Sequence, residues 1–245
     1  MLTLNNITVD FGGVKAVDNV SFSFQDRELL GLIGPNGAGK TTMMKVITGT
    51  VKPTSGSVTL DNTNLNGKAP YLRIRAGIGI SQQIVHPFNS MTVLENVTFA
   101  AGYIKTNHLF SSLFQTNRTA EKKAAVKLLE ILGIADVADA KPENLPLGYI
   151  KRLELARALA LKPKLLLLDE PLAGLNQSEA EKLSNTLQVL NQQGQNIILI
   201  EHNLAEVVRI CQRLVVIDNG KKIGEGDPKT VMNDPVVRTA YLGRS

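Results

Sequence analysis

A glycine-rich segment near the start of the chain has the composition and spacing of a phosphate-binding loop. Its residues fit the pattern G-x-x-x-x-G-K-[ST], and Thr42 comes directly after them: Gly34, Pro35, Asn36, Gly37, Ala38, Gly39, Lys40 and Thr41. Glycines let the backbone turn tightly, so that successive N–H groups can point at phosphate oxygens. Lys40 would supply a charge to the β and γ phosphates of a nucleoside triphosphate, and the Thr41 hydroxyl would bind Mg²⁺. The alternative is a glycine-rich turn with a chance lysine.

Two acidic residues and a histidine follow apolar runs elsewhere in the chain. Asp169 and Glu170 come directly after the run at 165–168, and His202 follows the run at 197–200. A buried strand that ends in an acid would place Asp169 beside the Mg²⁺ and Glu170 where it can act as general base for water. Each residue alone fits a structural role, the acids as part of a Glu-Pro turn. Together with the phosphate loop they indicate a hydrolytic site at one edge of a sheet.

The hydrophobic pattern of the first 60 residues predicts the elements that would hold the phosphate loop. Alternation of apolar and polar residues predicts strands at 2–9 and 20–24, and the apolar run 29–33 predicts a buried strand that leads into the loop. A helix is expected from Lys40 to Ile47, closed by Gly49. A turn over 53–56 would lead to a strand at 58–60.

The later part of the chain is predicted as helix at first and then as alternating strands and helices. Most of 92–160 is predicted as helix, and Thr92 with Glu95 has the spacing of a capping box. The apolar runs at 165–168 and 197–200 fit parallel strands buried on both faces, with an amphipathic helix at 178–190 between them. The sequence Asp218-Asn219-Gly220 predicts a hairpin.

Composition excludes several classes of protein. The chain has 245 residues, of which 43% are hydrophobic and 20% charged, and these are values of a globular protein that can bury a large core. Its net charge of +5 is scattered, and aromatic residues are 4% with no tryptophan, so no nucleic-acid partner is expected. The single cysteine, Cys211, is expected to be an inert core thiol. Neither a signal peptide nor an apolar run of the roughly 18 residues needed for a membrane helix is present, so we expect a cytosolic chain.

With these elements in place, the sequence resembles the ATP-binding subunits of ATP-binding cassette (ABC) transporters over essentially its whole length. The resemblance implies an α/β P-loop NTPase (RecA-like) core with an antiparallel β subdomain and an inserted helical signature subdomain. We expect one domain, with about 1–84 and 161–245 in the core and about 85–160 in the helical part. It also implies a dimer that closes on two ATP molecules with Mg²⁺, docked to transmembrane permease subunits at the cytoplasmic membrane face.

Further positions match motifs of the family. The resemblance implies that Phe11 stacks on adenine, that Gln83 touches Mg²⁺ and links the catalytic site to the permease, and that His202 is the switch histidine. Residues 173–176 match the loop after the catalytic glutamate. Phe11 also fits a core position, and Gln82 beside Gln83 is a second possible glutamine. The asparagine that ends the 173–176 loop also fits a helix N-cap, and both of its roles can hold together.

The signature segment departs from the family. Residues 145–149 read Leu-Pro-Leu-Gly-Tyr where an LSGGQ-like sequence is expected. The resemblance places Leu147 and Gly148 at the nucleotide of the partner subunit. Pro146 replaces a serine that would contact the γ-phosphate, so this half of the composite site is altered.

Three segments resemble the importers of branched-chain amino acids and of urea or amides: residues 171–176, 109–114 and 240–243. The sequence therefore predicts an ATPase that powers import of hydrophobic amino acids or related amides, with a substrate-binding protein as an indirect partner. Three alternatives stay open: export of lipid or lipopolysaccharide, a soluble ABC ATPase without a permease, and a cassette that binds ATP without hydrolysing it.

Overall fold

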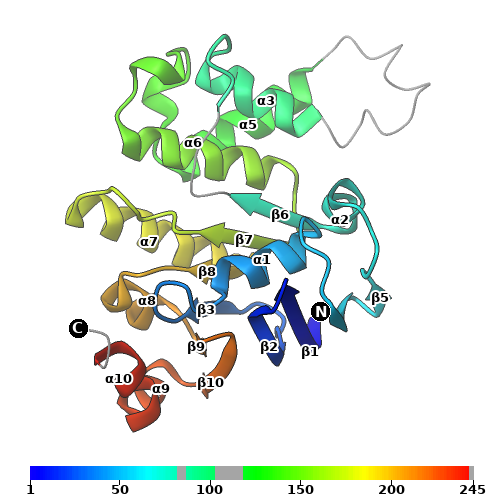
Figure 1. Ribbon diagram of the computed structural model, residues 1–245. Coiled ribbons are helices and arrows are strands. Elements are labelled where there is room, and N and C mark those ends of the chain that lie inside the picture. The colour runs from blue at the N-terminus through cyan, green and yellow to red at the C-terminus, as the bar shows by residue number, and fades with distance from the viewer. Residues whose placement is uncertain (82–86, 103–117, 243–245) are drawn as a thin grey trace.

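The computed structural model describes residues 1–81, 87–102 and 118–242. A six-stranded sheet forms the centre of the molecule, and Figure 1 shows its strands stacked below the green helices. In spatial order the strands are β10 (Lys221–Gly226), β9 (Arg213–Asp218), β3 (Leu29–Ile33), β8 (Asn196–Ile200), β7 (Leu165–Asp169) and β6 (Ile78–Ser81). All neighbouring pairs are parallel except β9 and β10, which form the hairpin expected at Asp218-Asn219-Gly220.

The parallel arrangement decides where the candidate residues meet. In parallel strands the carboxyl ends lie at one edge of the sheet. The phosphate loop follows β3, His202 follows β8 and Glu170 follows β7, and β8 lies between the other two strands. Segments separated by more than a hundred residues in sequence are therefore neighbours at this edge.

Alternate residues of the central strands face two different cores. In β7, Leu166 and Leu168 pack into a cluster with the helices α7 (Gln177–Gln192) and α8 (Leu204–Ile210), whereas Leu165 and Leu167 pack against α1 (Lys40–Thr48) and the second sheet. Side chains of a strand alternate between faces, so a sheet covered on both sides needs continuous apolar runs. This is why the strands are uniformly apolar, as the sequence predicted.

A four-stranded antiparallel sheet covers one face of the phosphate-loop region. Its order is β2 (Val14–Ser23), β1 (Leu2–Phe11), β4 (Ser55–Leu60) and β5 (Thr63–Asn64). The expected turn over 53–56 is shorter than predicted, because β4 already begins at Ser55. Gly56 permits this early start: a Cβ there would lie 2.4 Å from the carbonyl oxygen of Asn6 on β1.

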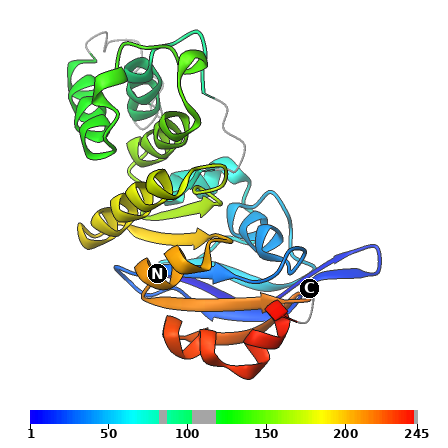
Figure 2. The same cartoon turned by 90° about the vertical axis from the view of Figure 1, so that its left-hand side faces the viewer.

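Among the described residues, three α-helices lie together above the sheet (Figures 1 and 2), and their buried side chains join the same core as Leu166 and Leu168 of β7. They are α3 (Val93–Gly102), α5 (Thr119–Ile131) and α6 (Leu147–Ala160). The capping box at the start of α3 is present, since Thr92 and Glu95 exchange bonds of 2.8 and 3.2 Å. The prediction of helix over most of 92–160 is wrong for 132–146. That stretch holds only two short 3₁₀ turns, at Ala135–Val137 and Pro142–Asn144, because Gly133 has a left-handed φ of 65° and Pro142 cannot continue a helix.

The remaining helices lie at the sides of the sheet. They are α2 (Pro70–Ala76), α9 (Pro228–Asn233) and α10 (Pro235–Leu242), the last two drawn in red in Figure 2. The helix expected at 178–190 is α7. It begins at the predicted N-cap Asn176, which forms a capping box with Glu179. Cys211 is buried, as expected. Within the described ranges, none of the helices has the length and apolar character required to cross a membrane.

Candidate active site

The phosphate loop is folded so closely that two of its glycines cannot be replaced. Gly34 has φ +155°, and a Cβ there would lie 1.9 Å from the carbonyl oxygen of Ile217 at the end of β9. Gly39 has φ +107°, and its Cβ would lie 2.4 Å from the carbonyl oxygen of Ala16 on β2. No side chain caps the start of α1, so the first amides of this helix face the loop. Free amides at a helix N-terminus are suited to binding phosphate.

Lys40 is buried and its ammonium lies inside the loop. Nζ donates to the carbonyl oxygens of Gly34 at 2.7 Å and Pro35 at 2.9 Å. Burial lowers the pKa of Lys40, and the carboxylates of Glu170 and Asp169 oppose that change. Thr41 and Thr42 lie in the first turn of the same helix, where Thr41 is exposed and Thr42 half-buried. The loop thus presents one cation, backbone donors and a free hydroxyl on one side.

Asp169, the last residue of β7, carries a buried oxygen that lacks a donor. Its Oδ1 has no hydrogen-bond partner among the described residues. Burial raises the pKa of Asp169, and the nearby Glu170 carboxylate raises it further. A buried carboxylate oxygen is costly unless it is paired. The site therefore fits a hard divalent cation, for which carboxylate and hydroxyl oxygens are suitable ligands.

Glu170 and His202 contact each other at the carboxyl edge of the sheet. The distance between Glu170 Oε1 and His202 Nε2 is 2.8 Å. Glu170 has a left-handed φ of 51°, which non-glycine residues rarely adopt, and its amide donates to the Ile200 carbonyl at 2.9 Å. Strained backbone at such a position is typical of functional sites. A carboxylate and an imidazole held together here can position a water molecule and take its proton.

Phe11 ends β1 at a tight hairpin and is 55% exposed. The alternative of a core aromatic is therefore wrong, because the ring is not covered. Gly12 and Gly13 form the turn with positive φ, and the Gly13 amide donates to Asp10 Oδ1 at 2.7 Å. The exposed ring is available to stack on a flat ligand.

The signature segment begins helix α6 and packs beside the loop that follows Glu170. Gly148 is buried, and a Cβ there would lie 3.1 Å from Glu179 Oε1. A Cβ on Gly174 would meet Leu147 Cδ2 at 2.8 Å. Pro146 occupies the N-cap position of α6. The N-cap residue is extended, with ψ 154°, and proline also fits that conformation.

Two buried charged residues at this edge are not among the predicted site residues. Glu201 follows an apolar strand, and Lys151 lies on α6. The sequence holds one signal for Lys151, because it is spaced three residues from Gly148 and four from Leu155, on the buried face of the helix. No comparable signal exists for Glu201. Gln83, its neighbour Gln82, His86 and His108 lie outside the described residues, as does the apolar segment 109–114.

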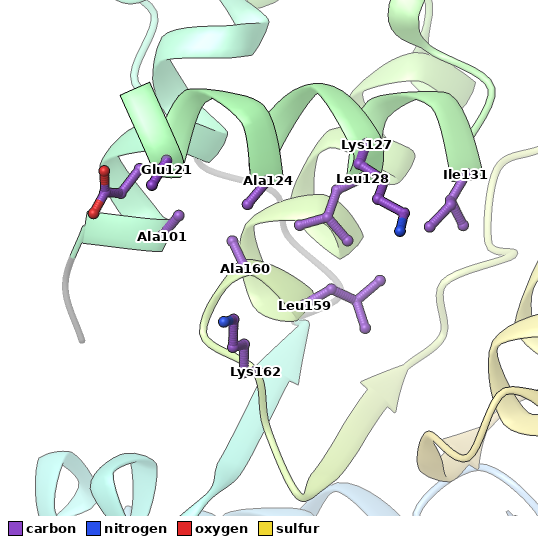
Figure 3. A pocket seen from close by; sticks show the side chains of 10 residues that line it. Ala101, Glu121, Ala124, Lys127, Leu128, Ile131, Leu159, Ala160 and Lys162 are labelled. Atoms are coloured by element: carbon purple, nitrogen blue, oxygen red, sulfur yellow. The ribbon is translucent and has the colours of Figure 1, made fainter. Parts of the chain in front are cut away.

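A cavity of about 510 Å³ lies in the helical part, between α3, α5 and the end of α6. Figure 3 shows that apolar side chains such as Leu128, Ile131 and Leu159 line it, with Lys127 and Lys162 beside them. Along α6 the cavity residue Ala160 is about 18 Å from Gly148, at 1.5 Å per residue. The cavity is therefore separate from the phosphate-binding edge.

The parallel sheet with a phosphate loop after β3 and acids after β7 defines a P-loop nucleotide hydrolase. Comparison with known proteins gives the family. The profile described as "ABC transporter" matches residues 17–173, and the profile described as "Branched-chain amino acid ATP-binding cassette transporter" matches residues 221–245. The chain belongs to the ATP-binding proteins of ABC transporters, and it is an ATPase of that family.

Similar proteins cover the whole chain. The high-affinity branched-chain amino acid transport ATP-binding protein LivG of Salmonella typhimurium is 39% identical, over 100% of this chain and 98% of its own length. The lipopolysaccharide export system ATP-binding protein LptB of Haemophilus influenzae is 32% identical, over 99% of this chain and 97% of its own length.

Among solved structures, the ADP conformation of the ABC transporter cassette MJ1267 has a TM-score of 0.86 at 34% identity, and it covers 100% of this chain and 99% of its own. The dimeric cassette MJ0796, bound to ADP and Pi, has a TM-score of 0.79 at 27% identity, and it covers 93% of this chain and 99% of its own.

Proposed function

We propose that this chain is the ATP-hydrolysing subunit of a membrane importer for branched-chain or other hydrophobic amino acids, or related amides. The observation that carries the ATPase chemistry is the 2.8 Å contact between Glu170 and His202 beside the phosphate loop. The observation that favours this substrate class is the match of residues 221–245 to the branched-chain amino acid profile, together with the identity to LivG.

The proposed hydrolytic roles follow from the chemistry of each side chain. Lys40 and the amides of residues 36–41 bind the β and γ phosphates, and Phe11 stacks on adenine. Glu170 takes the proton of the attacking water, while His202 orients Glu170 and the γ-phosphate. When bound, Mg²⁺ would supply positive charge that compensates the phosphates. Thr41 and Asp169 would hold this ion, with Gln83 as a further ligand expected from the resemblance.

The proposed working unit is a dimer docked to a permease, at the cytoplasmic face of the membrane. Support for the dimer is the dimeric structure of the similar cassette MJ0796. In this arrangement Leu147, Gly148 and the N-terminal amides of α6 face the ATP of the partner subunit. The positive end of the helix dipole would compensate in part for the missing serine hydroxyl.

Replacing Pro146 with serine tests this half of the site. We expect Pro146→Ser to lower the ATP concentration needed for dimerisation in a Glu170→Gln background, because one charge-assisted hydrogen bond contributes roughly 1.5–3 kcal/mol. A serine at the N-cap would also stabilise α6 by about 1 kcal/mol, so the melting temperature without nucleotide should rise slightly. Light scattering during an ATP titration measures the first effect. An unchanged or higher ATP requirement would mean that proline is adapted to this interface.

An exposed aromatic pair offers a surface for the permease. Phe88 and Phe99 are 41% and 47% exposed, and their rings meet edge to face at 5.4 Å. The Arg157 guanidinium lies 4.8 Å from the Phe88 ring centroid. The buried Asn96 side chain accepts from the Phe88 amide at 2.9 Å and donates to its carbonyl at 3.0 Å, so the loop before α3 is held in place. Rigid exposed aromatics are well suited to an interface with a helix of a partner.

Capture of the native partner tests the proposed function. A tagged chain expressed in its own cells should retain, from solubilised membranes, a permease and the cognate binding protein of an amino-acid importer. Phe99→Ala should weaken this capture, whereas Val236→Ala, which shortens a more exposed apolar side chain on α10, should not. Recovery of lipid-export components instead would favour the function of LptB, and recovery of a soluble scaffold would contradict transport.

A further inference from the structure

The buried carboxylate of Glu201 joins two loops of the hydrolytic site. Its Oε1 accepts a hydrogen bond from the amide of Leu172 at 2.6 Å, and its Oε2 accepts one from the amide of His202 at 3.1 Å. One side chain therefore holds the segment after β7 and the segment after β8 at the same time.

Lys151 reaches the same region from helix α6. Its buried Nζ donates to the main-chain carbonyl of Glu170 at 3.1 Å. Burial lowers the pKa of Lys151, and Glu201 is the carboxylate that opposes this change most. Two buried groups of opposite charge thus lie on either side of the short segment from Glu170 to Leu172.

The backbone of Glu170 needs such support. Its left-handed φ of 51° is unfavourable for a residue with a Cβ, and strained residues persist only where their surroundings hold them. Its carbonyl accepts from Lys151 and from the Ala173 amide at 3.2 Å, and its own amide donates to Ile200. The direction of the Glu170 carboxylate toward His202 depends on these bonds.

We propose that Glu201 and Lys151 are positioning residues that hold the Glu170 loop and the His202 loop in one arrangement and tie both to α6. The inference rests on the proposed roles of Glu170 and His202 in hydrolysis. Because α6 begins at the signature segment, the bond from Lys151 also fixes the position of the Glu170 loop relative to that segment.

Glu201→Gln is the first test. A glutamine has one acceptor oxygen where the amides of Leu172 and His202 need two, so the loops should lose their alignment. We expect kcat for ATP to fall about 10- to 100-fold, the scale of a misplaced catalytic group. Nucleotide affinity and binding stoichiometry, measured by titration, should stay within about twofold because the phosphate loop is unchanged. Glu225→Gln, an equally hydrogen-bonded carboxylate on β10, should leave kcat unchanged.

A double-mutant cycle shows whether Glu201 acts through His202. In a His202→Ala background, Glu201→Gln should cause little further loss of kcat, because the group that it positions is already absent. Losses that multiply fully in the double variant would overturn the proposal. So would a Glu201→Gln variant with the kcat of the wild type.

A third variant separates positioning from stability. Glu201→Gln combined with Lys151→Met removes both buried charges, which avoids leaving one of them unpaired. We expect its melting temperature to recover toward that of the wild type while kcat stays low. Recovery of kcat together with stability would show a merely structural pair. All of these assays use the purified chain without membranes, so their outcome is independent of which permease it serves.

Discussion

Glu170→Gln should abolish turnover while ATP still binds. The glutamine keeps the size of the side chain and can remain beside His202, but it cannot take a proton from water. Loss of a general base costs at least ~100-fold in rate, and we expect a decrease of that size or larger in steady-state ATP hydrolysis. Because ATP then stays intact, light scattering should detect a dimer that forms with ATP and not with ADP.

A matched variant controls for the loss of one negative charge. Glu130 lies on α5 and is exposed. The Glu130→Gln variant should therefore have the hydrolysis rate and the oligomeric state of the wild type. Ordinary turnover in Glu170→Gln would remove the base assignment. A variant that is inactive yet monomeric with ATP would instead contradict the dimer mechanism, and it would leave the base assignment in place.

Lys40→Ala should weaken ATP binding at least ~100-fold, because two charge-assisted hydrogen bonds to phosphate of roughly 1.5 kcal/mol each are lost. Hydrolysis should fall below detection at the same ATP concentration. Titration with a fluorescent ATP analogue measures the affinity directly. In this variant the carbonyl oxygens of Gly34 and Pro35 lose the hydrogen bonds that Lys40 Nζ donates to them. The melting temperature without nucleotide should therefore fall slightly.

Lys52→Ala is the control for this prediction, because Lys52 is an exposed lysine shortly after α1. Its ATP affinity should match that of the wild type. If Lys40→Ala bound and hydrolysed ATP normally, residues 34–41 would not be the phosphate-binding loop, and the proposed hydrolytic roles of Asp169 and Glu170 would lose their main support.

Local features of the fold could be predicted because neighbouring residues determine them. The capping boxes at Thr92 and Asn176 depend on groups three residues apart, so their spacing in sequence is enough. The hairpin at 218–220 and the helix stop at Gly49 depend on φ angles that few residues adopt. The strands β7 and β8 could also be predicted, because a continuous apolar run indicates a strand that is buried on both faces of a sheet.

The contacts between distant segments depend on the packing of the whole chain. The order of strands places β8 between β3 and β7 and brings His202 to Glu170, a contact that spacing alone does not contain. The exposure of Phe11 depends on whether another element covers it, and none of the described elements does.

Glu201 shows the limit of sequence reasoning most clearly. In the sequence, Glu201 is an acidic residue that follows a strand and precedes His202. In the fold it is buried, and it accepts a hydrogen bond from the amide of Leu172, 29 residues away. Lys151 gains its role in the same way, from the carbonyl of Glu170 across the gap between α6 and β7. Motifs and caps are local, so the order of the residues is enough to find them. Burial and the partners of a buried charge are properties of the whole packed chain, so they can be found only in the folded structure.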